Sequence, residues 1–533
     1  MSNVDYEAVI GLEVHAELET RSKMFCSCAR LDSTVALPNR AVCPVCAGMP
    51  GVLPVVNRRA VEYALRVALA LECEVAHTSL FVRKNYFYPD LPKGYQISQY
   101  EQPLARNGRL AILTSQGERL IRVRRVHLEE DTGKLTHVQR DYGLADDHHD
   151  LANGPSPALS SNLANAPRLP DDRQGKKLDR QETGAGGKSY SLVDLNRAGV
   201  PLLEIVSEPD LHTPEQVRAY AEALRSLLRY LGVNSGDMQK GLLRIEPNIS
   251  VRPVGSQALG TRSEIKNLNS FRALERSVAY EIQRQSELLR QGQPVVQETR
   301  GWDEGQGVTV PQRSKEEADD YRYFPEPDLP PLVIEQDWID GVRASLPELP
   351  AARLHRFQAK YGLGAYDAAV LTAERQVADF FEAALAAAPD VPPKSIANWL
   401  SGELFGLLNQ AGMGVEGSRV SPQALAALVS MVGRGEISQS SGKAVLVEAF
   451  HTGKQPQVIV AERGLRQISD LSAIAGLVER VLRENPEQVA AYLAGKTGLS
   501  RWLFGQVARL AGGQANPKIV QQELDRQLDE LKK

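Results

Sequence analysis

The chain has 533 residues, and its 62 basic and 66 acidic side chains give a formal net charge of −4. Hydrophobic residues make up 42% and charged residues 24% of the sequence, proportions that exclude a chain disordered throughout. No run approaches the roughly 18 apolar residues of a membrane helix, and the first residues lack a signal-peptide pattern. The composition predicts a cytoplasmic protein of several domains, with no membrane contact and no overall basic surface.

The first 345 residues have the pattern of a mixed α/β unit. Alternating apolar residues predict a strand over 6–18, and helical periodicity predicts helices over 59–73, 214–231 and 271–291. Thr213 and Pro214 suit the N-cap and the first position of the second helix. Residues 141–188 are rich in Asp, Asn, Gly and Pro without an apolar period, so we expect a surface insertion there.

The sequence pattern changes from mixed α/β to helical after 321–332. Four prolines in this segment predict an extended boundary. Helical patterns then follow one another over 373–388, 396–412, 422–433, 438–452, 471–485, 486–496, 499–512 and 517–531. The period lapses at 453–464, which separates a helical domain (346–460) from a mildly basic tail domain (461–533). The expected fold class is therefore α+β, with a mixed α/β domain (1–345) followed by two all-helical domains.

Four of the five cysteines form two close pairs, Cys26 with Cys28 and Cys43 with Cys46. Four thiolates at this spacing can complete a tetrahedral Zn²⁺ site, whereas disulfides are the weaker alternative in a reducing compartment. Four unliganded thiols in a turn region are the simpler alternative. We predict structural zinc.

Glu13 and His15 fall on one face of the predicted first strand, because side chains two positions apart project together. Further carboxylates could come from 127–131 (HLEED) or from Glu204, which interrupts an apolar run. Carboxylates with one imidazole suit Mg²⁺ or Mn²⁺. Solvated strand carboxylates are the alternative, since polar faces are common in antiparallel sheets.

The segment 81–99 mixes cations with aromatic rings. Such a mixture can hold phosphates and stack a base, although ordinary packing of a β-rich loop explains it equally well. Its cations are Arg83, Lys84 and Lys93, and its rings are Tyr86, Phe87, Tyr88 and Tyr95. The sequence shows no amidase nucleophile motif, so chemistry that uses ammonia would have to import it.

Long motif runs resemble one family, the B subunits of the aspartyl/glutamyl-tRNA amidotransferase. They include IGLEVHAEL, CPVCAGMPGVLPVVN, RKNYFYPDLPKGYQISQY, HLEEDTGK, SLVDLNRAGVPLLEIVSEPD, EIKNLNSF, QETRGWDE and DYRYFPEPDLPPL. The resemblance runs from Tyr6 to the C-terminus and breaks only across 141–188.

The resemblance implies a catalytic cradle, a helical domain and a tRNA-binding tail domain. It also implies a reaction, in which ATP phosphorylates the side-chain carboxylate of misacylated Asp-tRNA(Asn) or Glu-tRNA(Gln) and ammonia displaces the phosphate. The products would be Asn-tRNA(Asn) or Gln-tRNA(Gln). The implied partners are a glutaminase A subunit, a small C subunit and the tRNA.

The family's site positions carry over to residues of this chain. The resemblance implies that Glu13, His15, Glu130 and Glu204 bind Mg²⁺ and that Lys84 contacts phosphate of ATP. It also implies zinc on Cys26, Cys28, Cys43 and Cys46. One departure is RIEPNIS at 244–250, where many relatives have a Cys and an Asp in place of Ile245 and Glu246, so the role of Glu246 is unassigned.

A second hypothesis comes from another functional class. The chain could be a tRNA-binding or assembly subunit without its own catalytic step, with the zinc site as a scaffold. The gathering of Glu13, His15, Glu130 and Glu204 favours the enzyme, because a scaffold gains little from acids placed beside an anionic ligand.

Overall fold

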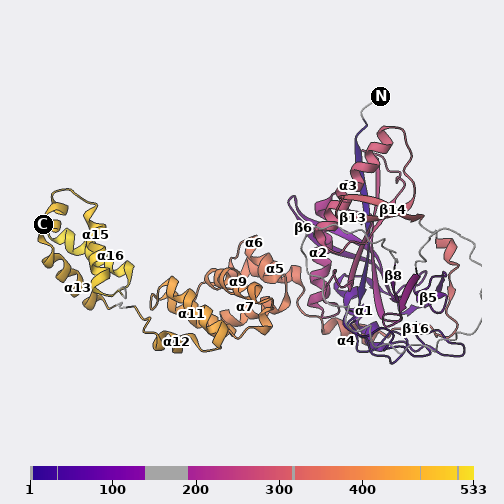
Figure 1. The fold of residues 1–533 in the computed structure, drawn as a ribbon, viewed down its shortest axis with the longest axis horizontal. Coiled ribbons are helices and arrows are strands. Elements are labelled where there is room, and N and C mark those ends of the chain that lie inside the picture. The colour runs from indigo at the N-terminus through magenta and orange to yellow at the C-terminus, as the bar shows by residue number, and fades with distance from the viewer. Residues whose placement is uncertain are drawn as a thin grey trace, which may run out of the picture.

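The computed structural model describes residues 4–32, 34–138, 190–314, 318–467, 470–512 and 515–532, and the expected insertion at 141–188 lies outside them. A sheet-rich first part is followed by helices alone, which confirms the α+β class (Figure 1). Among the described residues, no helix has both the length and the apolar character needed to cross a bilayer.

The first part is built on a nine-stranded sheet of order β14-β13-β12-β11-β1-β10-β7-β6-β2. β1 (Tyr6–Glu17) lies at its centre, as the alternating pattern predicted, and pairs antiparallel with β10 and β11. Only β12 and β13 pair in parallel among the described strands of this sheet. The other strands are β2 (Glu74–Val75), β6 (Ala105–Thr114), β7 (Gly117–Glu130), β10 (Pro201–Ser207), β11 (Leu243–Pro253), β12 (Ser263–Lys266), β13 (Glu298–Asp303) and β14 (Val308–Ser314).

Three small sheets flank the large one. β4 (Val82–Asn85) pairs with β5 (Tyr95–Ser98) and with β15 (Phe324–Pro325), and β3 (Thr78–Ser79) pairs with β16 (Leu332–Val333). The third sheet joins β8 (Lys134–Val138) to β9 (Tyr190–Asp194). β15 and β16 lie at the two ends of 324–333, which follows the 3-10 helix η2 (Ala318–Tyr321), so short strands occupy part of the segment predicted to be extended.

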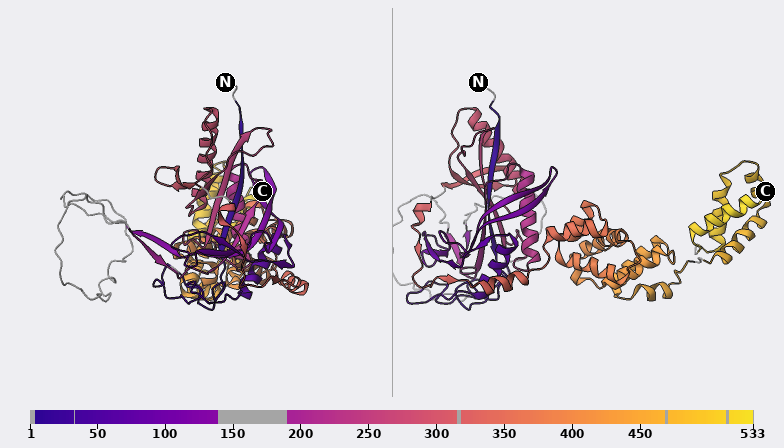
Figure 2. Two further views of the ribbon diagram at one scale, coloured as in Figure 1. Left: turned by 90° about the vertical axis from the view of Figure 1, so that its right-hand side faces the viewer. Right: turned by 180° about the vertical axis from the view of Figure 1, so that it is seen from behind.

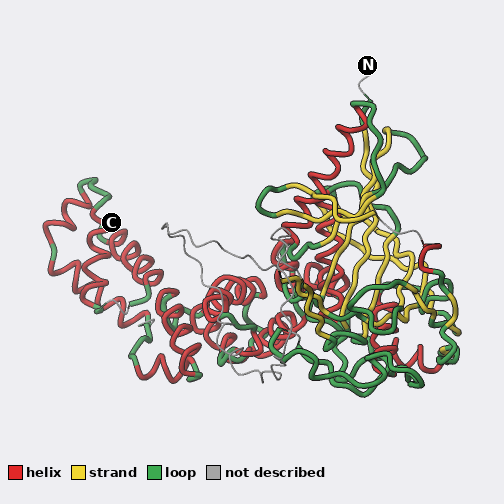
Figure 3. The backbone as a smooth tube through the Cα atoms, turned by 45° about the vertical axis from the view of Figure 1, so that its right-hand side comes forward, coloured by secondary structure: helices red, strands yellow, loops and turns green. Residues whose placement is uncertain are grey.

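Three long helices cover one face of the large sheet (Figures 1 and 3). They are α1 (Arg58–Ala70), α2 (Pro214–Tyr230) and α3 (Phe271–Arg290), close to the predicted ranges, and the Thr213 hydroxyl caps α2 by accepting from the Gln216 amide. Ile10, Leu12 and Val14 point from β1 into the core with these helices. The intervening residues of β1 therefore face the opposite side of the sheet.

The last part is helical, as predicted, but it contains helices that periodicity alone did not reveal. α4 (Gln336–Ala344), α5 (Pro350–Tyr361), α6 (Ala365–Thr372) and α12 (Pro456–Glu462) were not expected. α12 occupies most of the predicted break at 453–464, because it is too short for its period to stand out. The remaining helices are α7 (Arg375–Ala387), α8 (Pro393–Asn398), the π-helix η3 (Trp399–Leu404), α9 (Phe405–Ala411), the 3-10 helix η4 (Val415–Gly417), α10 (Pro422–Gly433), α11 (Gln439–Thr452), α13 (Leu471–Glu484), α14 (Pro486–Leu493), α15 (Leu499–Leu510) and α16 (Pro517–Glu530).

Buried apolar residues form three separate cores. The parts of the chain that contain them follow one another in the ribbon diagram (Figure 2). The first lies between the large sheet and its helices, the second runs from Phe357 to Val460, and the third from Ile474 to Leu528. The first two regions also touch, since the Tyr230 hydroxyl donates to the Thr372 carbonyl at 2.7 Å. The large sheet, with the face that α1, α2 and α3 leave uncovered, belongs to the first of these regions.

Candidate active site and metal centre

A polar row crosses the uncovered face of the large sheet. His15 on β1 lies directly opposite Glu204 on β10 and Arg244 on β11, and Glu204 lies opposite His127 on β7. Directly paired residues share a face of the sheet, so four strands contribute to one polar surface. Residues more than 200 positions apart meet there because β1 is central.

His15, Glu129 and Glu204 form a compact, mostly buried cluster within this row. The His15 Nε2 atom lies 3.5 Å from a Glu204 oxygen and 3.7 Å from a Glu129 oxygen. His127 Nε2 lies 3.3 Å from the same Glu204 oxygen. The three groups present ligand atoms within 4.8 Å of one another, so they could hold a metal ion.

The charged groups of the cluster shift one another's pKa values. Burial opposes charge on His15, but the hydrogen bond and charge of Glu204 raise the pKa of His15 to about 9. Burial would also raise the pKa of Glu204, yet the charge of His127 and hydrogen bonds from both imidazoles hold it well below its ordinary value. For Glu129, burial and the neighbouring Glu204 charge raise the pKa. A bound metal ion would add positive charge between these two carboxylates and so relieve the repulsion between them.

Glu13 lies in a neighbouring cluster on the same face, with Glu246 and Glu264. Glu13 accepts a hydrogen bond from the Asn248 amide at 3.1 Å, and Lys266 lies 2.9 Å from Glu246. Burial disfavours the Glu246 carboxylate, but Lys266 and His15 lower its pKa to about 2. The structure thus gives Glu246 a place beside Glu13, which sequence reasoning left open.

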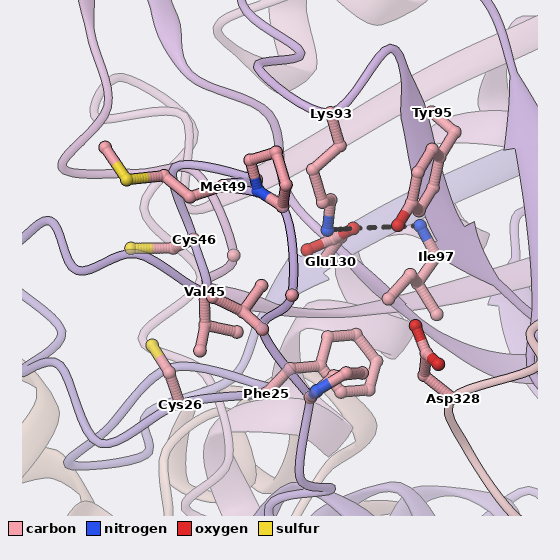
Figure 4. A pocket seen from close by; sticks show the side chains of 16 residues that line it. Phe25, Cys26, Val45, Cys46, Met49, Lys93, Tyr95, Ile97, Glu130 and Asp328 are labelled. Atoms are coloured by element: carbon pink, nitrogen blue, oxygen red, sulfur yellow. Dashed lines mark hydrogen bonds and ion pairs between the residues drawn. The ribbon is translucent and has the colours of Figure 1, made fainter.

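Glu130 does not join His15 and Glu204, contrary to the predicted convergence. Side chains alternate along β7, so Glu129 rather than Glu130 shares the face of His127. Glu130 pairs with Lys93 and accepts a hydrogen bond from the Ile97 amide at 2.9 Å. It lines a cavity of about 190 Å³ together with Cys26 and Cys46 (Figure 4).

Lys84 lies beside the His15 cluster on β4. Burial disfavours its ammonium, but the nearby Tyr323 and Glu129 raise its pKa, so it stays charged. Its Nζ atom lies 4.7 Å from the Tyr321 ring centre and 5.9 Å from that of Tyr86. The expected mixture of cations and rings therefore meets the carboxylates, in an arrangement that can accept an anionic ligand.

The four paired cysteines gather around one point, as the spacing predicted. Their sulfur atoms all lie within 4.8 Å of one another, and those of Cys43 and Cys46 are 3.8 Å apart. This separation equals the edge of about 3.8 Å expected for a tetrahedron with Zn–S bonds of about 2.3 Å. The Cys43 amide also points at the Cys46 sulfur at 3.2 Å. These cysteines could therefore hold a metal such as zinc.

The groups around Cys46 favour its thiolate form. A hydrogen bond from Cys26 lowers the pKa of Cys46 to about 4, and the charge of Lys23 acts in the same direction. Gly48, two residues on, has a φ of +66° and packs so closely on Lys93 that a Cβ there would overlap the Lys93 Cγ. The cysteine loop thus closes directly over the cavity that holds Glu130.

The His15 cluster also offers ligands for a divalent ion. Its distances of 3.5 and 3.7 Å lie between the separations of about 3.0 Å for neighbouring and about 4.2 Å for opposite ligands around an octahedral ion with bonds near 2.1 Å, so the side chains would shift by about half an ångström to bind one. The Nδ1 atoms of His15 and His127 are buried and have no hydrogen-bond partner in the described part of the chain. Carboxylate oxygens together with one imidazole nitrogen suit Mg²⁺ or Mn²⁺ better than a soft metal.

Sequence reasoning missed several residues of this face. Glu129 is adjacent to the predicted Glu130, and the register of β7 against β10, which places His127 opposite Glu204, decides which of the two shares the face of His15. Glu264 and Lys266 lie within EIKNLNSF, where their positions are set by pairing of β12 with β11 and gave no local signal. The pairing of Lys93 with Glu130 depends on the fold of the β4–β5 hairpin.

Comparisons with known proteins cover nearly the whole chain. Residues 8–149 and 171–340 match a family described as the GatB/GatE catalytic domain, and residues 379–528 match one described as the GatB domain.

Full-length relatives share one name, the B subunit of the aspartyl/glutamyl-tRNA(Asn/Gln) amidotransferase. The protein of that name from Thermomicrobium roseum is 49% identical over 527 residues, 99% of each chain. Those from Roseiflexus sp. and Myxococcus xanthus are each 48% identical, over 98% of this chain and 99% of their own. The chain therefore belongs to the family of B subunits of the aspartyl/glutamyl-tRNA(Asn/Gln) amidotransferase, as its motifs predicted.

Proposed function

We propose that this chain is the catalytic subunit that activates and amidates a misacylated tRNA. ATP phosphorylates the side-chain carboxylate of Asp-tRNA(Asn) or Glu-tRNA(Gln), and ammonia from a partner glutaminase then displaces the phosphate as the amide forms. The observation that carries this proposal is the buried cluster of His15, Glu129 and Glu204 beside Lys84.

The reaction explains why acids gather on a site for anions. A carboxylate is a poor acyl donor, and its phosphorylation supplies the leaving group that amide formation needs. Mg²⁺ bound by His15, Glu129 and Glu204 would neutralise charge on the phosphates of ATP. Lys84, held by aromatic rings and carboxylates, would bind a phosphate oxygen as a compact point charge. Glu13 on β1, with Glu246 beside it, would help to orient the three metal ligands.

The cysteine site has a separate, structural role in this proposal. Four thiolates fill the tetrahedron of a zinc ion and leave no coordination position for a substrate. Zinc on Cys26, Cys28, Cys43 and Cys46 would therefore stabilise the loop that forms one wall of the cavity around Glu130.

Different parts of the chain would have different roles in this reaction. Residues 1–345 would form the catalytic cradle, 346–460 the helical domain, and 461–533 a tail domain that binds the body of the tRNA. The glutaminase A subunit and the small C subunit would complete a heterotrimer, acting in the cytoplasm with no membrane contact.

Amidation of both misacylated tRNAs by the reconstituted complex tests this proposal. With glutamine or ammonium as the nitrogen source, we expect ATP-dependent formation of Asn-tRNA(Asn), Gln-tRNA(Gln) or both, and ADP release that requires the misacylated tRNA. A complex that binds tRNA but shows no tRNA-dependent ATP cleavage would support the non-catalytic assembly role instead.

A further inference from the structure

Among the lysines of the described residues, Lys23 is the one whose side chain is completely shielded from solvent. A lysine ammonium has three donor hydrogens, and Lys23 Nζ has three acceptors. They are the Ala41 carbonyl at 2.7 Å, the Leu195 carbonyl at 3.1 Å and the Cys46 sulfur at 3.6 Å. Every donor is used, so the ammonium is held in one position.

The charge of Lys23 requires an anionic partner, because an isolated buried ammonium is very costly. No ion pair joins Lys23 to a carboxylate in the described ranges, and its two oxygen acceptors are neutral carbonyls. The Cys46 sulfur is the acceptor that can be negative. Four thiolates around Zn²⁺ carry a net charge of −2, which the ammonium reduces to −1.

Lys23 also connects the cysteine site to the turn before β10. The Met24 amide donates to the Gly199 carbonyl at 2.7 Å, and the Asn196 side chain accepts from the Arg40 and Ala41 amides. A Cβ at Gly199 would lie 3.5 Å from the Cys46 Cβ and 3.9 Å from a Glu130 oxygen. Lys23 therefore lies where the cysteine loop, the Leu195–Gly199 turn and the Glu130 cavity meet.

We propose that Lys23 is the positioning residue and counter-ion of the four-cysteine site, holding the Cys46 thiolate and the Leu195–Gly199 turn in register. This inference rests on the proposed zinc at that site. Groups outside the first coordination shell typically change metal affinity 10–100-fold when removed, although they touch no metal.

Zinc retention by the full-length chain tests this role. Zinc-loaded wild type, Lys23→Met and Lys240→Met are placed in competition with a chromogenic chelator, and the zinc content and release rate are measured. Lys240 is a matched control, because its exposed ammonium pairs with Asp32 on the surface. We expect zinc affinity at least about tenfold weaker in Lys23→Met and unchanged in Lys240→Met.

Wild-type affinity in Lys23→Met would overturn the inference while leaving the zinc site intact. A wild-type chain without zinc would overturn both, whereas the amidation assay tests the proposed reaction separately.

A double-mutant cycle covers the case in which Lys23→Met folds poorly. If the ammonium is balanced by the Cys46 thiolate, Lys23→Met should lower the urea midpoint of unfolding less in a Cys46→Ser background than in wild type. Equal decreases in the two backgrounds would show that Lys23 acts through packing and carbonyl hydrogen bonds alone, which would contradict its role as a counter-ion.

Discussion

Glu129 and Glu130 are neighbours in the sequence, yet they face opposite sides of β7 and meet different partners. Glu129 lies 3.7 Å from His15, whereas Glu130 pairs with Lys93 in the cavity beside the cysteine loop. A strand's two-residue period makes this separation unavoidable. One carboxylate is therefore available to a metal ion on the sheet face, and the other already has an ammonium partner.

This difference predicts opposite responses to the same chemical change. Glu129→Gln removes a charged ligand, so we expect the Mg²⁺ concentration needed for half-maximal tRNA-dependent ATP cleavage to rise about 10–100-fold. Glu130→Gln should leave that concentration unchanged, because its carboxylate lies on the other side of β7. A magnesium titration of both variants measures this directly, and the reverse ranking would restore Glu130 as the ligand.

The sequence predicted the residue types of the site better than their grouping. Glu13, His15 and Glu204 were each found from an acid or imidazole within an apolar strand, and all three lie on one face. Assigning the fourth ligand required the register of β7 against β10, which places His127 opposite Glu204. Register depends on long-range pairing, so the local pattern HLEED could not distinguish Glu129 from Glu130.

At the scale of elements, α11 packs closely against η3 through a glycine. A Cβ at Gly442 would lie 2.7 Å from a Val432 methyl and 2.9 Å from the Trp399 ring. Alanine normally stabilises a helix interior relative to glycine by about 0.5–1 kcal/mol. We instead expect Gly442→Ala to lower the free energy of unfolding by about 1–3 kcal/mol, because the added methyl group would overpack the contact with Val432 and Trp399.

Gly406 in α9 is a matched control, since a Cβ there would have no heavy atom within 4 Å. Gly406→Ala should therefore keep or raise the free energy of unfolding in the same urea titration. Stabilisation by Gly442→Ala would show that α11 can move away from η3 at little cost.

A second element-level contact joins α5 to α7 through Glu382. Its carboxylate accepts hydrogen bonds from Arg356 at 2.6 and 2.9 Å, from Arg353 at 2.7 Å and from the Tyr361 hydroxyl at 2.8 Å. The Arg356 hydrogen bonds lower the pKa of Glu382 to about 2. The charged form is thus favoured by the fold, and it links two helices of the second core.

The sign of the pH effect follows from this pKa. The folded pKa lies below the ordinary value of 4.5, so the stabilisation is complete above about pH 5 and is lost as the pH falls toward 2. We expect Glu382→Gln to lower the free energy of unfolding by about 1–3 kcal/mol at pH 7 and by less at pH 4. Urea titrations at both pH values measure this, and a difference independent of pH would contradict it.

At the scale of the whole molecule, the sequence predicts that a sheet-rich part precedes the helical parts. It does not predict the exact boundaries between those parts. Apolar periodicity and the prolines of 321–332 separated the sheet-rich part from the helical part. The expected break at 453–464 instead holds α12, whose Ile459 and Val460 belong to the second core. Seven helical residues give less than two full turns of pattern, which is too little for periodicity to identify.

The tail has its own hydrophobic core, so it can be removed without cutting into the second core. Truncation after Gln467 retains α12 and Leu465, which pack on the second core, and removes α13 to α16. We expect the truncated complex to show a higher KM for tRNA with a similar kcat, because the tail would bind ground and transition states alike. Its affinity should also depend less on salt, by a slope of roughly 0.7–0.9 for each phosphate group that the tail no longer neutralises. Unchanged affinity and salt slope would make the tail an assembly element.

In the proposed reaction, the His15 cluster of this chain activates the carboxylate of the tRNA-borne amino acid. A single-turnover assay with α-labelled ATP and misacylated tRNA, in the complex without a nitrogen donor, follows the labelled ADP that this step releases. We expect wild type to release ADP in an amount that follows the misacylated tRNA, and Glu204→Gln to slow that release at least about 100-fold. ADP release by Glu204→Gln at the wild-type rate would show that the chemistry takes place elsewhere.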